Sequence, residues 1–208
     1  MAALEFITDT VEALENKKST LAVFLDLSKA FDTINHDIIL AKLDFYGIRG
    51  IVYDGMTSYL SNRSQYVHFD DCKSPLMSIN CGVPQGSVLG PLLFVIYMND
   101  LPDCLNKANG ILFADDTTLY ISSDSLEELY NDMNLELKTL SDWFLANKLS
   151  LNLNKTNYML FTNRCFANDD AANLCVGDII IERKACVKFL GINIDENLTW
   201  NNHIVMLK

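Results

Sequence analysis

The 208-residue sequence predicts an α+β fold in which an antiparallel sheet is backed by helices. Half of the residues are hydrophobic and 21% are charged, which is the balance of a globular domain with a sizeable core. Apolar runs of strand length are interleaved with segments of helical period, and a hairpin rather than a β-α-β repeat stands at the centre. No linker, repeat or low-complexity tract interrupts the chain, so we expect one continuous domain over residues 1–208.

The first elements are a helix and a buried strand. The helix is expected to end in the polar cluster 16–19, and the unbroken apolar run 21–25 then predicts a strand that delivers the carboxylate of Asp26 to the edge of the sheet. The face that this helix is expected to bury comprises Leu4, Ile7, Val11 and Leu14.

Two helices and a pair of short strands follow. Asn35 can cap a helix that stops at Gly47, and a second helix is expected to run through Tyr59. Residues 65–69 and 76–80 have the length and composition of strands on either side of a polar turn.

The second half of the chain contains a helix, a tight hairpin and a long amphipathic helix. Residues 87–99 predict a helix in which Pro91 is tolerable only near the first turn. Residues 111–114 and 117–121 predict a hairpin with two acids at its tip. The longest helix is expected from 126 to 144, where apolar residues recur every three or four positions. Later strand-like segments comprise 158–162, a hairpin around 176–178, and 187–194.

Composition limits where the protein acts and what it binds. The longest apolar run, 92–98, is far too short to span a bilayer, and no secretory signal is visible, so we expect an intracellular protein with no membrane partner. A net charge of −11 argues against a domain that grips nucleic acid unaided, because phosphate affinity comes mainly from Lys and Arg. Six irregularly spaced cysteines are expected to be reduced and mostly buried: Cys72, Cys81, Cys104, Cys165, Cys175 and Cys186.

Three carboxylates stand at strand ends in different parts of the chain, namely Asp26, Asp115 and Asp116. If the two strands are neighbours, these groups converge and repel by ~4 kcal/mol per pair at an effective dielectric constant of about 20, so they would need a cation. Oxygen ligands select a hard ion such as Mg²⁺ or Mn²⁺, and two such ions ~3.5–4 Å apart support in-line attack at phosphorus. The pattern therefore favours phosphoryl or nucleotidyl transfer, although adjacent acids in a turn are also common as solvated turn formers.

Three motifs occur in a fixed order: 24–32 (FLDLSKAFD), 82–87 (GVPQGS) and 113–116 (FADD). Together they resemble the central motifs of reverse transcriptases. The sequence between them resembles the non-LTR retrotransposon branch, the jockey-like elements of animals, and the resemblance runs from about residue 21 to 204. The segments that carry this second resemblance include 35–37 (NHD), 46–50 (YGIRG), 58–63 (SYLSNR) and 89–94 (LGPLLF).

The resemblance implies a palm that adds nucleotides from dNTPs to the 3′-OH of a DNA primer on an RNA template, using two Mg²⁺ ions, with Mn²⁺ as a substitute. Asp26 and Asp115 would be the metal-binding pair, with the Leu27 carbonyl as a further ligand and Asp116 completing the acidic cluster. Lys155 matches a lysine that is proposed to protonate the departing pyrophosphate, and a solvated loop lysine is the alternative.

Further matches concern the substrate. Phe31 stands where the family places an aromatic gate beneath the sugar, which would exclude a 2′-OH, and a core aromatic is the alternative. Gly82, Gln85 and Gly86 would shape a loop under the nascent base pair and the template, because glycines permit a tight turn and a close backbone approach. Residues 189–191 (FLG) resemble the primer-grip hairpin.

The chain also departs from the family. Only 25 residues precede Asp26, so we expect part of the fingers without the fingertip strands and their basic residues. The thumb is expected to be missing, with residues 187–208 as the end of the palm or the start of the thumb. Binding of template and primer would then need the missing fingers and thumb or flanking domains of the element.

Two other functions stay open. The chain could be a catalytically silent relic of a polymerase with at most an interaction role: the intact acids favour the enzyme, and the missing fingers and thumb favour the relic. A phospho-receiver domain ranks lower, because its acid pair follows the first strand of a regularly alternating parallel fold. The three histidines, His36, His68 and His203, are expected to be structural or exposed.

Overall fold

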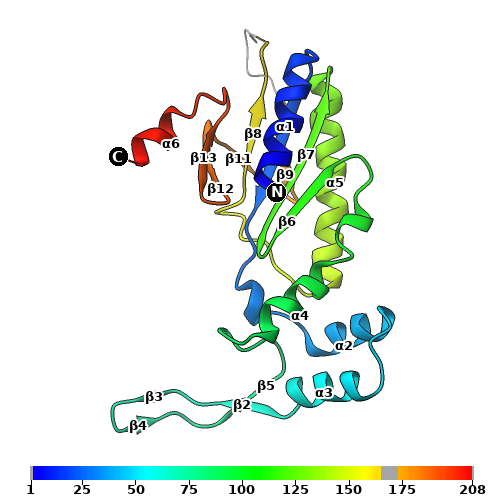
Figure 1. The fold of residues 1–208 in the computed structure, drawn as a ribbon, viewed down its shortest axis with the longest axis vertical. Helices are drawn as coiled ribbons and strands as arrows, with labels where there is room; N and C mark the ends of the chain where they lie inside the picture. Colours follow the sequence, from blue (N-terminus) through cyan, green and yellow to red (C-terminus); the bar gives the residue numbers. More distant parts are fainter. Residues whose placement is uncertain (1, 165–172, 208) are drawn as a thin grey trace. The chain divides into compact units, whose positions relative to one another are not determined.

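The computed structural model describes residues 2–164 and 173–207 (Figure 1). Its chain divides into two compact units. The first unit contains Met1–Ser28, Leu101–Leu145 and Ser150–Lys208, and the second contains Lys29–Asp100 and Ala146–Leu149.

A five-stranded sheet forms the centre of the first unit, with the strand order β11-β8-β1-β7-β6. Every neighbouring pair is antiparallel except β11 with β8. β1 lies in the middle and all seven of its residues are buried, which explains its unbroken apolar run. The strands are β1 (Ser19–Leu25), β6 (Asn109–Phe113), β7 (Asp116–Ser123), β8 (Asn157–Phe161) and β11 (Glu182–Arg183).

Helices cover both faces of this sheet. The predicted long helix is α5 (Leu126–Ala146), whose Tyr130 ring meets Tyr158 of β8 edge to face at 6.1 Å. Met159 belongs to the core cluster on the opposite face, where α1 (Ala2–Glu15) packs, because side chains alternate along a strand. α1 and α5 therefore lie on opposite sides of the sheet.

The buried face of α1 agrees with the predicted one only in part, because Ile7 and Leu14 pack against the core cluster but two other predicted residues do not. Leu4 and Val11 are 63% and 38% exposed, whereas Phe6, Thr10 and Ala13 are buried. The Phe6 ring determines which face of α1 is turned toward the sheet, because it makes edge contacts with aromatic rings from four strands. Buried Thr10 is tolerated since its hydroxyl donates to the Phe6 carbonyl at 2.7 Å. The aromatic partners of Phe6 are Phe24, Tyr120, Phe161 and Phe189.

The C-terminal part of the first unit forms two small hairpins and a short helix. The predicted turn at 176–178 joins β9 to β10, and the predicted segment 187–194 folds as β12 and β13 around Leu190 and Gly191. The bounds are β9 (Cys175–Val176), β10 (Ile179–Ile180), β12 (Cys186–Phe189), β13 (Ile192–Asp195), α6 (Asn201–Met206) and the 3-10 turn η2 (Pro102–Cys104).

The second unit consists of helices and a long hairpin. α2 packs against α3 and α4, and the Asn35 side chain caps α2 by accepting from the Ile38 amide at 3.1 Å, as predicted. In the hairpin, β2 pairs with β5 and β3 with β4. The bounds are η1 (Ala30–Asp32), α2 (His36–Phe45), α3 (Ile51–Leu60), β2 (Arg63–Gln65), β3 (His68–Phe69), β4 (Cys72–Lys73), β5 (Met77–Ile79) and α4 (Leu89–Met98).

Two further expectations concern cysteines and membranes. Cys165 lies outside the described residues. Cys72, Cys81, Cys175 and Cys186 are free thiols; of these, Cys72 and Cys81 are exposed rather than buried, whereas Cys175 and Cys186, like Cys104, are half-buried. Within the described ranges, no helix is both long and apolar enough to cross a bilayer.

Candidate active site

The three predicted acids lie in the first unit, at one end of the two central strands. β1 and β7 are adjacent and antiparallel, and their register pairs Leu25 with Thr117. The same register carried one residue further places Asp26 opposite Asp116. Asp115 belongs to the two-residue turn that joins β6 to β7.

Strand alternation also assigns the acids to a face of the sheet. Phe24 and Tyr120 belong to the core cluster on the α1 side. Asp26 and Asp116 are two and four residues from them along the same strands, so both carboxylates extend toward the same side. The acids therefore lie at the end of the aromatic core, where Asp26 is half-buried and Asp116 is exposed.

The charges of the acids affect one another. Asp116 is exposed as a whole residue, but its carboxyl is partly desolvated by the surrounding chain; this raises its pKa above the ordinary value, and the charges of Asp115 and Asp26 raise it further. Among the described residues, no three His, Cys, Asp or Glu side chains are arranged to hold a metal ion. The donor set is nevertheless all oxygen, which suits a hard divalent cation, and a cation would relieve the repulsion that raises this pKa.

Segment 150–152 extends the sheet beside Asp26. Leu27 and Leu151 face each other across an antiparallel bridge. The bonds of this bridge run from the Asn152 amide to the Asp26 carbonyl and from the Ser28 amide to the Ser150 carbonyl, both 2.8 Å long. Leu27 itself is thus a non-hydrogen-bonded partner, so its carbonyl points away from Leu151 and toward the side of β7.

This segment also brings Lys155 to the acids. The Lys155 ammonium lies 3.8 Å from an Asp26 carboxylate oxygen, and the Asp26 amide donates to the Thr156 hydroxyl at 3.4 Å. The lysine side chain is 69% exposed, so the ion pair itself adds little stability. Sequence reasoning missed the supporting roles of Asn152 and Thr156, although the alternation of leucine with polar residues from 149 to 154 is a strand pattern that indicates them.

The predicted substrate residues Phe31, Gln85 and Gly86 belong to the second unit. The Phe31 ring is half-buried and lies 4.9 Å from the Phe94 ring at an interplanar angle of 34°. Phe31 thus contributes to packing and keeps a partly open surface. Both interpretations of this residue, sugar gate and core aromatic, agree with that position.

The glycine-containing loop 82–86 begins beside the segment that carries Phe31. Gly82 adopts a φ of +83°, and a Cβ at this position would lie 2.8 Å from the Asp32 carbonyl oxygen. Only glycine satisfies both conditions without strain. Gly86 also has a positive φ, of +78°.

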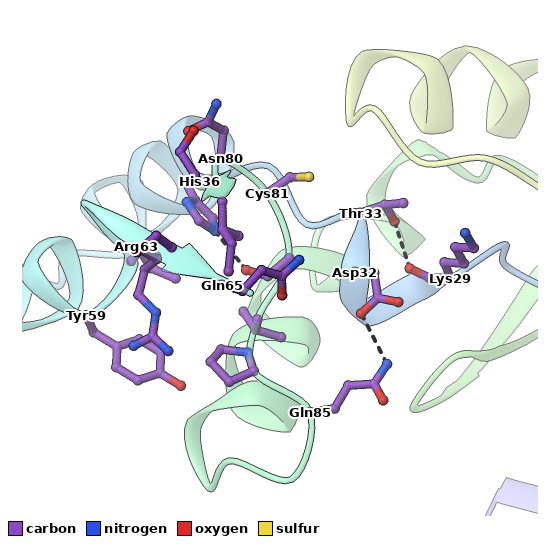
Figure 2. A pocket seen from close by; sticks show the side chains of 17 residues that line it. Lys29, Asp32, Thr33, His36, Tyr59, Arg63, Gln65, Asn80, Cys81 and Gln85 are labelled. Carbon is purple, nitrogen blue, oxygen red and sulfur yellow. Dashed lines mark hydrogen bonds between the residues drawn. The ribbon is translucent and has the colours of Figure 1, made fainter. Parts of the chain in front are cut away.

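A cavity of about 760 Å³ lies in the second unit beside this loop (Figure 2). Lys29 and Arg63 contribute positive charge to its wall, and Asp32 contributes the opposite charge. The Arg63 guanidinium lies over the Tyr59 ring, 5.5 Å from its centre. Sequence reasoning assigned no role to Asp32, Arg63 or Tyr59, because no local pattern marks a cavity wall.

The chain matches a family model described as "Reverse transcriptase (RNA-dependent DNA polymerase)" over residues 2–194. It is 32% identical to the probable RNA-directed DNA polymerase from transposon BS of Drosophila melanogaster, with 93% of this chain and 22% of the relative covered. It is 30% identical to the RNA-directed DNA polymerase from mobile element jockey of Drosophila funebris, with 95% and 22% covered. The chain thus spans about a fifth of the length of these relatives.

Solved structures of telomerase share the fold. The telomerase of Candida tropicalis in complex with a TWJ fragment of telomeric RNA matches with a TM-score of 0.61 and 12% identity, over 96% of this chain and 32% of the telomerase chain. The apo enzyme truncated from its C-terminal domain matches with a TM-score of 0.60 and 12% identity, over 95% and 38%. At this identity the likeness concerns the fold alone, and it agrees with the predicted reverse-transcriptase-like α+β palm.

Proposed function

Because the chain belongs to the reverse transcriptase family, in the branch of the non-LTR retrotransposons, we propose that it forms the core of an RNA-directed DNA polymerase. In this function it would transfer nucleotides from dNTPs to a primer 3′-OH under the direction of an RNA template. The observation that carries the proposal is the position of Asp26 and the Asp115–Asp116 pair at one end of adjacent antiparallel strands.

The acidic end of the sheet would hold the divalent metal ions. Asp26, Asp115 and the Leu27 carbonyl would be the ligands, and Asp116 would add negative charge. Two Mg²⁺ ions bound there would assist attack at the phosphorus atom and stabilise the leaving group. Desolvation is the larger cause of the raised pKa of Asp116, but the charges of Asp115 and Asp26 add to it, and this added repulsion is what a bound cation would relieve.

The remaining residues would bind and orient the substrates. Lys155, which is attached to the sheet through segment 150–152, would give a proton to the departing pyrophosphate. Phe31 would close the space for a 2′-OH beneath the incoming sugar. Gln85 and Gly86 would contact the template and the nascent base pair.

A catalytically silent relic is the second candidate. The net charge of −11 favours it, because affinity for phosphates comes mainly from Lys and Arg. Such a protein would keep the fold and bind partners without polymerisation.

Primer extension separates the two candidates. The experiment measures Mg²⁺-dependent dNTP incorporation on a primed RNA by a protein in which residues 1–208 are extended at both ends with the corresponding parts of a related element. We expect extension that Asp115→Asn abolishes. Asp103→Asn, which removes the same charge from an exposed residue of η2, is the matched control and should leave extension unchanged. A folded, extended protein that incorporates nothing would favour the relic, and activity that survives Asp115→Asn would exclude the proposed acidic site.

A further inference from the structure

We infer that Asp32 and His36 are positioning residues that fix the carboxamide of Gln85, so that its carbonyl oxygen faces a hydrogen-bond donor of a bound nucleotide. The inference rests on the proposed function, since it specifies how loop 82–86 would meet its ligand. Both residues belong to the segment 31–36, far from the loop in sequence but beside it in the second unit.

Backbone hydrogen bonds fix the base of the loop. The Gly82 amide donates to the Ile34 carbonyl at 2.7 Å, and the Val83 amide donates to the Phe31 carbonyl at 2.9 Å. Asn35 and Cys81 form an antiparallel bridge just before these bonds. Backbone hydrogen bonds therefore join the start of the loop to segment 31–36, as they join neighbouring strands of a sheet.

His36 adds a side-chain contact at the same point. Its Nε2 lies 2.7 Å from the Gly82 carbonyl oxygen in a partly buried position. A carbonyl oxygen only accepts, so Nε2 carries the hydrogen. Both the neutral ring with its proton on Nε2 and the imidazolium donate here, and the contact therefore survives a change in the charge of the ring.

Asp32 then fixes the side chain at the far end of the loop. The Gln85 Nε2 donates to an Asp32 carboxylate oxygen at 3.1 Å, as Figure 2 shows at the cavity wall. An ionised carboxylate only accepts, so the amide nitrogen of Gln85 must face Asp32 and the amide oxygen must face away. The orientation of a glutamine amide, which is usually ambiguous, is thus set by its partner.

This orientation restricts the ligand group that Gln85 can bind. Its exposed oxygen accepts a hydrogen bond, so the partner must be a sugar hydroxyl or a base N–H. Phosphate oxygens are acceptors and are excluded, whereas Lys29 and Arg63 of the same cavity have the charge that phosphate requires. The cavity therefore offers the Gln85 oxygen to a sugar hydroxyl or a base N–H of a nucleotide, and Lys29 and Arg63 to its phosphate.

The sequence contains only two glutamines, Gln65 and Gln85, and both line the cavity. Selective ¹⁵N-glutamine labelling of residues 1–208 thus gives two side-chain amides in an NMR spectrum, and Gln65 is an internal control. We expect the Gln85 amide to show one hydrogen-bonded proton with slowed exchange. Asp32→Ala should return this signal to that of a free amide and leave Gln65 unchanged.

The His36 contact is tested with two substitutions of different reach. In His36→Gln, the amide nitrogen lies nearly as far from the backbone as the imidazole Nε2, so it can still donate to the Gly82 carbonyl. In His36→Asn, the side chain is one carbon shorter and its amide nitrogen does not reach this carbonyl. We expect His36→Gln to keep the Gln85 signal and His36→Asn to broaden it. The side-chain signal of the new glutamine in His36→Gln is recognised by its absence from the spectrum of the parent chain.

The functional part of the test is binding of single-stranded oligonucleotides at low salt. Loss of one hydrogen bond predicts about a fivefold weaker affinity for Asp32→Ala and for Gln85→Ala, with no further loss in the double variant. An RNA, a DNA and an abasic strand of equal length distinguish the two donors: a loss confined to RNA assigns the 2′-OH, and a loss shared by RNA and DNA but absent for the abasic strand assigns a base.

Three results would overturn the inference. The first is a free Gln85 amide in the parent chain, and the second is an amide signal that Asp32→Ala leaves unchanged. The third is an effect of Asp32→Ala on affinity that persists in the Gln85→Ala background. A parent chain that binds no oligonucleotide, while its Gln85 signal still depends on Asp32, would reject the nucleotide-binding function and leave the hydrogen bond itself established.

Discussion

Gly82 allows loop 82–86 and segment 31–36 to approach closely, because it has no side chain. Its positive φ and the 2.8 Å separation between a built Cβ and the Asp32 carbonyl oxygen leave no room for a methyl group. We expect Gly82→Ala to lower the free energy of unfolding by ~1–3 kcal/mol, because the backbone must leave the left-handed region or segment 31–36 must move.

Urea denaturation followed by circular dichroism measures this change, and Gly55→Ala is the matched control. Gly55 lies inside α3 with open space around its Cα, so alanine there should raise the free energy of unfolding by ~0.5–1 kcal/mol through helix propensity. Equal effects of the two substitutions would show that the loop tolerates a side chain at position 82.

The Phe31 ring gives a second prediction about a single side chain. In an active, extended protein, Phe31→Ala should increase incorporation of ribonucleotides relative to deoxynucleotides, because removal of the ring opens space for a 2′-OH. Competition between rNTP and dNTP on a primed RNA measures the ratio. Unchanged discrimination together with a lower melting temperature would assign Phe31 to packing against Phe94 instead.

Among the elements, the junction of β13 with α6 depends on a buried carboxylate. Burial acts to raise the pKa of Asp195, but hydrogen bonds from the amide and hydroxyl of Thr199 and from the amides of Trp200 and Asn197 outweigh it and hold this pKa below its ordinary value. A carboxyl whose pKa is lower in the folded state stabilises that state above its unfolded pKa, and this stabilisation is lost as the pH falls through the folded pKa.

We therefore expect Asp195→Asn to reduce the free energy of unfolding at neutral pH by about 1–3 kcal/mol, since hydrogen bonds to a charged acceptor are replaced by weaker ones. The difference from the parent chain should shrink as the pH falls below about 4, the ordinary pKa of this carboxyl in the unfolded chain, and should vanish once the pH has passed the lower pKa of the folded chain. Denaturation curves at several pH values measure it. Asp103→Asn is the control, and a difference that is independent of pH would contradict this origin.

For the whole molecule, charge balance is the main limit on nucleic-acid binding. The chain has 16 Lys and Arg against 27 Asp and Glu, whereas affinity for a duplex depends on several basic contacts to phosphates.

We expect residues 1–208 alone to polymerise feebly or undetectably, and their binding to a primed RNA to disappear between about 50 mM and 200 mM salt. Fluorescence anisotropy and primer extension, each with Asp115→Asn as control, measure the two properties. Robust extension by residues 1–208 that Asp115→Asn abolishes would contradict this expectation, and it would show that the excess of acidic residues does not prevent polymerisation.

Local patterns determined much of this protein in advance. The apolar run before Asp26 predicted a central strand, the spacing of apolar residues predicted α5, and Asn35 predicted the start of α2; the structure confirms all three. These features depend on residues that are close together in the chain, so they can be predicted from the local sequence. The ordered motifs added the family, which the comparisons confirm.

Only the tertiary structure decided which distant groups meet. The contact of Phe6 with four aromatic rings set which face of α1 is buried, so that Leu4 and Val11 are exposed against the prediction. The parallel pairing of β11, the attachment of segment 150–152 beside Asp26 and the contacts of His36 with Gly82 and of Gln85 with Asp32 were equally invisible. The last two contacts join residues that are 46 and 53 positions apart in the sequence. The periodicity of apolar residues cannot predict such contacts, because they depend on how complete helices and strands pack together.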